Sequence, residues 1–427
     1  MRVSHIPGVL SYTPAWETAT GLNFRGDEFL MHRSSANAYD CIIAGAGPAG
    51  TSAAIHLATS GARVLLAEQK AFPRAKLCGE FISPECLDHF ERLGVADRMI
   101  SSGGASLTQT VFYSRTGHSV VVPSEWFGGS SRALGLSRAE MDNNLLERAK
   151  NVGVVVLEDA HVSDLITDEC SVRGIRLKSA GATTDYHALV TIDATGRTRA
   201  LARRLDQERK SPGRKTRPRL VAFKAHLEKA RVADGECEIY FYPGGYGGLS
   251  SIEGGLSNLC FIALAKDVRR YDSNPERVVR EIVSKNSRAA YTLDGASTCS
   301  EWLSVSLETF GRRTLVPANG MLTVGDAAAF IDPFTGSGML MALESGEVAA
   351  QAIVPEIGRL RDGESFESIA REYRTQYASR FDSRMPVSGL LRRAAFVPRL
   401  AEAAIIFFSA NKRLRRKLAR ATRKGTR

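Results

Sequence analysis

Three glycines and one glutamate form the clearest chemical pattern in the chain. Gly45, Gly47 and Gly50 have the spacing G-x-G-x-x-G, and Glu68 follows eighteen residues later. In such a turn the first glycine allows a tight bend, the second lets the main chain approach a diphosphate, and the third lets a helix pack on its strand. A helix N-terminus can hold phosphate oxygens through its free N–H groups, and Glu68 can accept the hydrogen bonds of a ribose diol. These residues predict a dinucleotide site and leave NAD and FAD both open.

The segments around this turn have the order that such a site requires. An apolar run at 40–44 precedes the turn, an alanine-rich segment at 51–60 follows it, and a second apolar run at 63–67 ends at Glu68. This order predicts strand, turn, helix and strand, which is one βαβ unit. The alternative is a glycine-rich turn in a parallel sheet that binds no ligand.

A second turn of small residues lies nearly three hundred residues further along the chain. Residues 321–324 read as a buried strand, Gly325 and Asp326 follow, and the run 331–340 leads into a helix reaching about Val354. This second helix N-terminus is predicted to face an anion or a polarised oxygen, and Asp326 can take a ribityl or ribose hydroxyl. Together the two turns predict one long ligand that lies across the sheet.

Three further features are candidates for chemistry, each with an ordinary alternative. Cys78 lies in a loop after Glu68 and is either a pocket thiol or a small buried hydrophobe. Arg138 follows the capping residue Ser137 and lies in the first turn of a helix, where the helix dipole disfavours a cation. It therefore either pairs with a ligand anion or is a solvated surface arginine. The aromatic and glycine-rich segment 240–250 is either a pocket wall over a redox centre or a tyrosine-rich turn.

The remaining patterns predict a fold of class α/β with two domains. Segments within 105–136 and 220–310 alternate like antiparallel strands of a separate sheet, and 363–410 is helical in pattern. The basic residues from Arg197 to Arg219 are predicted to form a solvated connection. The predicted units are a flexible extension at 1–38, a discontinuous Rossmann-like cofactor-binding domain at 39–110, 137–212 and 311–362, a mixed antiparallel substrate-binding sheet at 111–136 and 213–310, and C-terminal helices with a basic tail at 363–427.

Composition excludes several other classes of protein. The chain has 427 residues and a formal charge of +11, but residues 412–427 hold nine Lys or Arg and no acid, which leaves the rest with a net charge of +2. No electrostatic footprint for nucleic acid is therefore expected on the body. Seven scattered cysteines without C-x-x-C spacing argue against disulfides and structural zinc, and no metal site is predicted.

The expected location is the cytoplasm. The chain has no run of eighteen apolar residues and no secretory signal pattern. Residues 401–410 are apolar and run directly into the basic tail, so this pair either lies on an anionic membrane at its inner face or forms a solvated tail.

With these blocks in place, the chain resembles the FAD-dependent oxidoreductases of the geranylgeranyl reductase family, within the wider class built like para-hydroxybenzoate hydroxylase. The resemblance covers roughly residues 39–385. It is carried by the glycine turn with Glu68, by Lys-Leu-Cys-Gly-Glu at 76–80, by 136–142, and by the Gly-Asp block at 325–338. The late block implies FAD rather than NAD as the cofactor.

The resemblance also implies roles for individual residues. Arg138 would reach the FAD from its helix, Val162 would meet the adenine through its backbone, and Gly338 and Met339 would present N–H groups to the flavin ring, where they stabilise the reduced anion. Cys78 matches the family's active-site cysteine. The candidate catalytic residues are Cys78 and Tyr246, and the candidate cofactor-binding residues are Gly45, Ala46, Gly47, Pro48, Ala49, Gly50, Glu68, Lys76, Gly79, Arg138, Val162, Gly325, Asp326, Gly336, Ser337, Gly338 and Met339.

The chain departs from the patterns of this class at two places, and it also lacks a halogenase motif. In the motif P-x-x-Y-x-W-x-F-P, Pro243 and Tyr246 fit, but Gly248 replaces Trp and Ser250 replaces Phe, which predicts a wider pocket and a changed substrate. The Asp-Gly pair of many aromatic hydroxylases is replaced by Asp-Ala-Thr-Gly at 193–196. All three tryptophans are isolated, so the W-x-W-x-I-P motif of flavin-dependent halogenases is missing.

The resulting hypothesis is a flavoenzyme that reduces a carbon–carbon double bond in a hydrophobic, isoprenoid-like or polyketide-like substrate, with NAD(P)H as the electron donor. The alternative is an FAD-dependent monooxygenase that uses NAD(P)H and oxygen. A halogenase or a non-catalytic module that binds flavin or lipid ranks below both. The small hydrophobic substrate is the expected partner.

Overall fold

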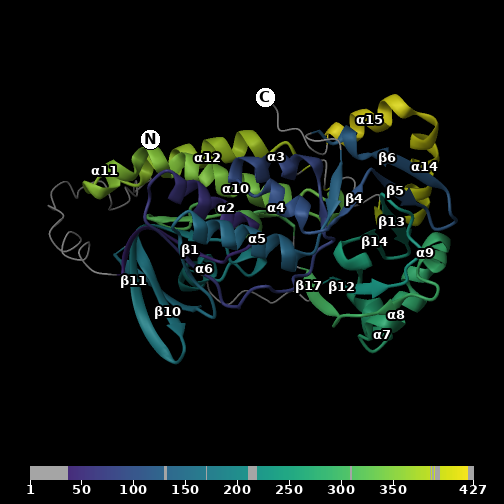
Figure 1. Ribbon diagram of the computed structural model, residues 1–427, viewed down its shortest axis with the longest axis horizontal. Coiled ribbons are helices and arrows are strands. Elements are labelled where there is room, and N and C mark those ends of the chain that lie inside the picture. Colours follow the sequence, from purple (N-terminus) through teal and green to yellow (C-terminus); the bar gives the residue numbers. More distant parts are fainter. Residues whose placement is uncertain are drawn as a thin grey trace, which may run out of the picture.

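The computed structural model describes residues 37–421, apart from 129–131, 170, 210–218, 308–309, 385, 387–388 and 390–394. Almost all of the predicted extension at 1–38 and the last six residues of the basic tail lie outside the described residues. Figure 1 shows two sheets side by side along the longest axis, with a layer of helices over the sheet that contains β1.

The first sheet contains the predicted βαβ unit. Its seven strands have the order β8-β2-β1-β11-β10-β9, and β19 pairs with β11. The β1 strand runs parallel to β2 and β11, whereas β10 is antiparallel to both of its neighbours. The strands are β1 (Ala38–Ala44), β2 (Val64–Ala67), β8 (Val155–Leu157), β9 (His161–Asp168), β10 (Ser171–Ser179), β11 (Ala182–Asp193) and β19 (Met321–Thr323).

Helices pack against one face of this sheet because their apolar residues meet the alternate side chains of β1, β2 and β11 in one large core. The closest pair is α2 and α10, and a β-carbon added at Gly346 of α10 would lie 2.4 Å from the carbonyl oxygen of Ala49 in α2. This close approach packs the start of α2 against the middle of α10. The helices of this unit are α2 (Pro48–Thr59), α3 (Pro84–Leu93), α4 (Ala96–Ser101), α5 (Arg138–Asn151), α6 (Ala202–Arg209), α10 (Gly338–Ile353), α11 (Ile357–Arg361) and α12 (Glu367–Phe381).

The second sheet has eight strands in the order β16-β12-β15-β14-β13-β5-β6, and β17 pairs with β12. Short helices pack on one of its faces through a core of aromatic and aliphatic side chains. Its elements are β5 (Gln109–Tyr113), β6 (Ser119–Pro123), β12 (Leu220–Glu228), β13 (Glu236–Tyr242), β14 (Gly245–Ser251), β15 (Ser257–Leu264), β16 (Ser297–Thr298), β17 (Leu303–Leu307), α7 (Ala265–Arg270), α8 (Pro275–Glu281) and α9 (Ser287–Thr292).

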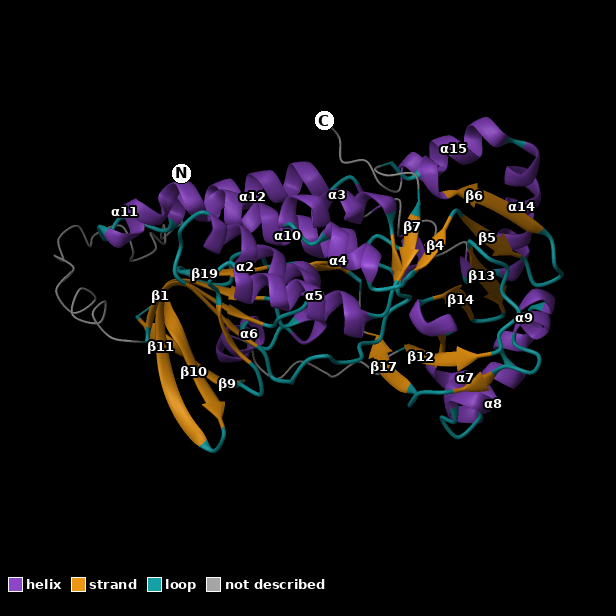
Figure 2. Ribbon diagram, viewed as in Figure 1, coloured by secondary structure: helices purple, strands orange, loops and turns teal. Residues whose placement is uncertain are grey.

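The remaining short strands form two small sheets, β3-β7-β4 and β18-β20. Two C-terminal helices lie beside β6 in Figure 2. The connecting strands are β3 (Phe81–Ile82), β4 (Ala105–Leu107), β7 (Ala133–Gly135), β18 (Gly311–Arg312) and β20 (Ala329–Phe330). The C-terminal helices are α14 (Pro398–Ala410) and α15 (Lys412–Ala421).

The predicted fold class, a Rossmann-like unit with a second mixed sheet and C-terminal helices, is confirmed. The domain boundaries stay a prediction. One local expectation differs from the structure, because the described part of the connection after Arg197 contains α6 and lines a pocket. The described part of the basic tail is a helix, α15, whose Ala419 packs on Trp126. Among the described residues, no helix combines the length and apolar character needed to cross a bilayer.

Candidate functional site

In the glycine turn after β1, the packing of the chain requires a glycine at two positions but not at Gly47. Gly45 has φ +104°, and a β-carbon there would lie 2.4 Å from the Ala194 carbonyl oxygen. A β-carbon at Gly50 would lie 1.9 Å from the Gly45 carbonyl oxygen. At Gly47, by contrast, an added β-carbon would meet only the Arg138 side chain, at 4.0 Å. The space in front of Gly47 is therefore open, which suits a group that approaches the main chain at the start of α2.

The late turn lies against the early one. A β-carbon added at Gly325 would be 2.8 Å from the Ala49 side chain, and the Gly325 N–H donates to Ser345 Oγ at 2.8 Å. Gly336 has φ +61°, and Ser337 then leads into α10 at Gly338, where an added β-carbon would meet only Ile331, at 4.0 Å. The structure thus leaves two open glycine positions, Gly47 and Gly338, each at the start of a long helix.

This pair of positions fits an extended dinucleotide. Both helix termini offer N–H groups and the positive end of a dipole, which favour phosphate oxygens at one site and an electron-rich ring edge at the other. Ala46, Pro48 and Ala49 are buried around the first position. The predicted assignment of the early glycines to the diphosphate and of Gly338 and Met339 to the flavin ring stays a proposal that this geometry supports.

A buried chain of alternating charges runs beside the early turn. The Ala46 N–H donates to Glu68 Oε2 at 2.9 Å, and Arg74 approaches the same oxygen at 3.4 Å. Arg74 also donates to Asp142 at 3.2 Å, and Arg138 binds both oxygens of Asp142 at 2.8 and 2.7 Å. The Glu68 carboxylate is therefore held at the end of β2, beside the turn, where a ribose would be bound.

Arg138 is placed to face an anion at Gly47. Burial lowers its pKa, but the paired Asp142 carboxylate outweighs burial and raises the pKa above its ordinary value, so Arg138 stays charged. Sequence analysis missed Arg74 and Asp142 as partners. The i to i+4 spacing of Arg138 and Asp142 within one predicted helix was the available signal for the second of them.

Cys78 lies at the N-terminal end of α10. Its sulfur is 3.9 Å from the Met339 sulfur and accepts a hydrogen bond from the Glu80 N–H at 3.4 Å. Asn258 of β15 donates to the Cys78 carbonyl oxygen at 3.1 Å, which ties the loop to the second sheet. The structure therefore brings Cys78 and Met339 together, and the roles that the family resemblance implies for them stay predictions.

A buried ion pair next to Cys78 joins the loop to the second sheet. Glu80 is fully buried with φ +53°, a left-handed conformation that is uncommon for a residue with a side chain. Its Oε1 accepts from Lys224 Nζ at 2.5 Å and from the Arg138 N–H at 2.8 Å, and its Oε2 lies 2.7 Å from His226 Nε2. Burial raises the pKa of Glu80, but His226 and Lys224 outweigh it and hold the pKa below its usual value.

Sequence analysis missed this cluster. Lys224 stands in the alternating pattern of β12 at a position that is only 2% exposed. A lysine within a buried strand segment was the one visible signal, and its partner Glu80 lies 144 residues away in the sequence.

Tyr246 holds the second sheet against the late turn. Its hydroxyl donates to Asp332 Oδ1 at 2.5 Å, and its ring packs edge-on against Phe334 at 5.3 Å between centroids. Burial and the neighbouring Asp332 raise the pKa of Tyr246 well above its ordinary value, so the hydroxyl stays protonated. The geometry supports a positioning role for this predicted catalytic residue.

The sheet face that carries Tyr246 is an apolar wall, which α14 covers in part through Ala401 and Ile405. Tyr246, Phe241 and Ile262 pack together, with Leu77 and Phe334 against them. At Gly248, an added β-carbon would lie 2.9 Å from Ile239 Cδ1. Ile239 thus occupies part of the space that a larger residue at position 248 would need, and the wall stays apolar.

The remaining predicted residues lie at the margins of this region. Lys76 and Gly79 lie in the loop that contains Cys78, and Gly79 is exposed. Burial of its ammonium group, with Arg74 and Arg138 nearby, lowers the pKa of Lys76. Val162 is two residues after Ala160, whose N–H donates to the Glu68 carbonyl oxygen at 2.9 Å. Burial raises the pKa of Asp326, whereas the charges of Arg197, Arg138 and Lys76 oppose this effect.

Comparisons with known proteins agree with this arrangement. A protein family described as "FAD binding domain" matches residues 38–354. A digeranylgeranylglycerophospholipid reductase of Methanosarcina mazei is 27% identical over 321 residues, covering 74% of each chain. A menaquinone reductase of Mycolicibacterium smegmatis is 27% identical over 327 residues, covering 73% of this chain and 75% of the relative.

Solved structures share the fold at low sequence identity. A geranylgeranyl bacteriochlorophyll reductase-like protein from Thermoplasma acidophilum superposes with a TM-score of 0.72 at 18% identity, covering 87% of this chain and 92% of that chain. A flavin-dependent brominase superposes with a TM-score of 0.74 at 22% identity, covering 90% and 93%. At these identities the likeness establishes the shared fold.

Proposed function

The chain belongs to the FAD binding domain family and is an FAD-dependent oxidoreductase, and from this premise we propose that it reduces a carbon–carbon double bond in a hydrophobic substrate. We take this substrate to be isoprenoid-like or polyketide-like. The reductase names of the relatives support reduction, and the geranylgeranyl group in one of those names is an isoprenoid. The observation that carries the proposal is the apolar wall of the second sheet beside the Cys78 loop and the start of α10.

Bound FAD, once reduced, supplies a hydride to the double bond. The early turn with Gly47 and Arg138 holds the diphosphate, and Glu68 holds the adenosine ribose. The N-terminus of α10 at Gly338 and Met339 positions the ring. Because polar substrates gain nothing from an apolar wall, this wall selects hydrophobic ones and excludes water.

We assign Cys78 the role of positioning the substrate or giving it a proton, since its sulfur lies beside Met339 at the start of α10. Tyr246 fixes the wall through its bond to Asp332. NAD(P)H is the proposed electron donor.

An anaerobic assay tests the proposed function. The FAD-loaded protein, reduced with dithionite and incubated with geranylgeranyl lipids, should yield products that gain two hydrogens per reduced bond, as read by mass spectrometry. Turnover should persist without oxygen because hydride transfer does not require it. A product that gains one oxygen atom, formed only in air, would reassign the chain as a monooxygenase. Absence of any product with every donor would favour a non-catalytic binding module.

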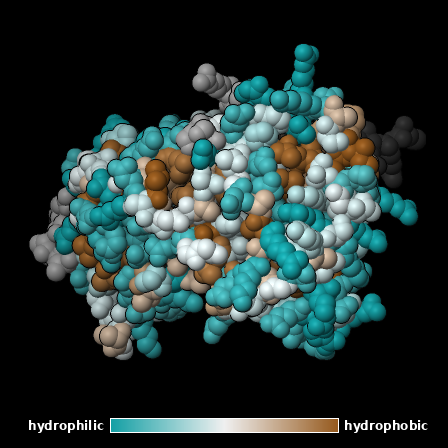
Figure 3. Space-filling model, turned by 45° about the vertical axis from the view of Figure 1, so that its right-hand side comes forward, coloured by the Kyte–Doolittle hydropathy of each residue, from teal (hydrophilic) through white to brown (hydrophobic). Residues whose placement is uncertain are grey.

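We also propose that the C-terminal helices bring the enzyme to an anionic membrane surface. On α14, Leu400 and Phe407 are 56% and 55% exposed, while Ile405 on the opposite side is buried against the second sheet. The next helix, α15, contains six basic residues and no acid. Apolar surface gathers in the upper right of Figure 3, on the side to which these helices belong. An apolar patch next to a cationic helix is the pattern of an interfacial membrane helix.

Substituting Leu400→Ser and Phe407→Ser together should reduce binding to anionic vesicles at both low and high salt, because apolar insertion is not screened. Deleting Lys412 to Arg427 should reduce binding mainly at low salt. Co-sedimentation with phosphatidylglycerol vesicles measures both effects. The matched control is Ile100→Ser, since Ile100 is an exposed hydrophobe on α4. Wild-type binding by both test variants would contradict the membrane proposal.

A further inference from the structure

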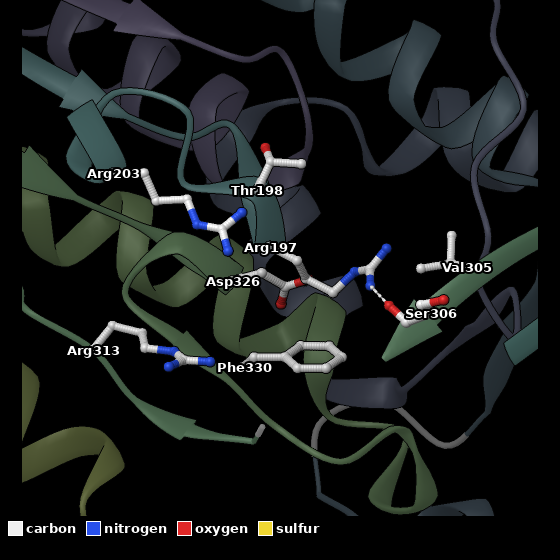
Figure 4. Close-up of a pocket in the computed structure, with 8 residues that line it drawn as sticks. All are labelled: Arg197, Thr198, Arg203, Val305, Ser306, Arg313, Asp326 and Phe330. Carbon is white, nitrogen blue, oxygen red and sulfur yellow. Dashed lines mark hydrogen bonds between the residues drawn. The ribbon is translucent and has the colours of Figure 1, made fainter. Parts of the chain in front are cut away.

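A pocket with a cationic lining contains Asp326 in its wall. It has a volume of about 180 Å³ and is lined by Arg197, Thr198, Arg203, Val305, Ser306, Arg313, Asp326 and Phe330. Figure 4 shows Arg203 and Arg313 extending toward Asp326 from one side, while Arg197 extends from beside it toward Ser306. The pocket is accessible, since Arg203 is exposed and Arg197 and Arg313 are partly exposed.

The three arginines reach the pocket from separate segments. Arg197 lies in the 3-10 turn Gly196–Thr198, Arg203 lies at the start of α6, and Arg313 follows β18. Arg197 contacts the Ser306 carbonyl oxygen at 3.4 Å and lies 5.5 Å from the centre of the Phe330 ring. The Arg313 N–H donates to the Ala328 carbonyl oxygen at 2.8 Å, which fixes that segment next to Asp326. These contacts position two of the arginines on a rigid frame.

Charge and size limit what this pocket can bind. Three arginines and one aspartate leave a net charge of +2 among the lining residues. A guanidinium is planar with five N–H donors, so it can bind phosphate oxygens while keeping a contact to the protein. The volume is below the range of about 300–1,000 Å³ that is typical for whole ligands. The pocket therefore suits the anionic group of a larger molecule rather than all of it.

We propose that this pocket binds the diphosphate group of a ligand that exchanges during turnover. A diphosphate carries two or more negative charges and so balances the net charge of +2 on the lining residues. This group is distinct from the diphosphate of the bound FAD, which we place at Gly47 and Arg138. The diphosphate has two candidate sources: the nicotinamide dinucleotide that donates electrons, and an isoprenoid diphosphate that serves as substrate. In naming these sources, the inference rests on the proposed function.

A direct binding experiment tests the pocket without relying on activity. Inorganic pyrophosphate is titrated into the FAD-loaded protein by calorimetry, for the wild type and for Arg203→Gln and Arg313→Gln. Each substitution should weaken pyrophosphate binding about tenfold or more, because each removes a charge-assisted hydrogen-bond donor. Arg280→Gln is the matched control, since the Arg280 side chain is 70% exposed on α8 in the second unit. Absent binding in the wild type, or equal weakening by Arg280→Gln, would overturn the proposal.

Two kinetic arms then identify the source of the diphosphate. The first experiment measures the NADPH concentration that gives half-maximal anaerobic bleaching of the flavin. If this concentration is higher for the Arg203→Gln protein than for the wild type, the pocket is assigned to the electron donor. In the second, dithionite replaces NADPH and geranylgeranyl diphosphate is varied, and an increased KM assigns the pocket to the substrate. If neither value changes, the pocket does not serve an exchanging ligand and the inference fails.

FAD content separates this inference from the proposed function. Both variants should retain FAD at the wild-type ratio, and a parallel loss of FAD would show that the pocket belongs to the resident cofactor. If no lipid is reduced by the wild type, the proposed function fails, whereas the pyrophosphate titration still decides the pocket.

Discussion

Replacing Gly47 by valine is expected to weaken FAD binding about 100-fold while the chain stays folded. Gly47 has φ −76° and ψ 179°, an extended conformation that valine adopts readily, and no protein atom lies closer than 4.0 Å to an added β-carbon. The new side chain would fill the open space that we assign to the diphosphate. Loss of two charge-assisted hydrogen bonds at about 1.5 kcal/mol each corresponds to a dissociation constant that is about 100-fold larger.

Titration of the apoprotein with FAD, followed by quenching of flavin fluorescence, measures this effect, and the thermal midpoint by circular dichroism reports on folding. The matched control is Gly358→Val in α11, where an added β-carbon would also meet no atom within 4 Å. This control should bind FAD like the wild type. Wild-type FAD affinity in the Gly47→Val protein would mean that the diphosphate does not lie at this turn.

Replacing Lys224 by methionine should destabilise the protein by about 3–5 kcal/mol, because it leaves the Glu80 carboxylate buried without its ammonium partner. Glu80 is fully buried and Lys224 is only 2% exposed, so water cannot replace the lost contact. The remaining neighbours of Glu80 are His226 and the Arg138 N–H. The urea midpoint of unfolding should therefore fall markedly.

Lys150→Met provides the comparison, since its pair with Glu147 at 2.9 Å is 40% and 42% exposed. That substitution should change the unfolding free energy by no more than about 0.5 kcal/mol. Adding Glu80→Gln to Lys224→Met should recover part of the stability, because the unbalanced charge is removed while hydrogen bonding is kept. Equal effects of Lys224→Met and Lys150→Met would show that the buried pair does not hold the Cys78 loop to the second sheet.

The Gly47 and Lys224 substitutions report on different parts of the protein: the first on the cofactor site, the second on the contact between the Cys78 loop and the second sheet. Gly47 has no side chain and so leaves room for a ligand at the start of α2. Its replacement should therefore affect ligand binding more than folding. Lys224 acts through a buried charge pair that crosses from β12 to the Cys78 loop, so its replacement should affect folding first. Because Arg138 also donates its N–H to Glu80, a weakened pair is expected to loosen the start of α5 and so lower FAD affinity as a secondary effect.

The sequence alone determined the elements whose signals are local. The βαβ unit was predicted because the glycine spacing, the flanking apolar runs and Glu68 all lie within one short stretch. The cap of α5 at Ser137 was predicted because the capping side chain lies next to the backbone group that it satisfies, the Glu140 N–H. Strand alternation likewise predicted β12, β13 and β15 of the second sheet, because a strand with one buried face has a period of two.

Only the tertiary structure decided which distant residues meet. The pair of Lys224 with Glu80 and the convergence of Arg197, Arg203 and Arg313 join segments far apart in the chain. No local pattern encodes such contacts, because they depend on how the two sheets pack and on which strands become neighbours. For the same reason, a basic segment predicted to be solvated contributes to a defined pocket, and a basic tail contains a docked helix. Local chemistry fixed where a dinucleotide can bind, and the packing of one sheet against the other decided which charges surround it.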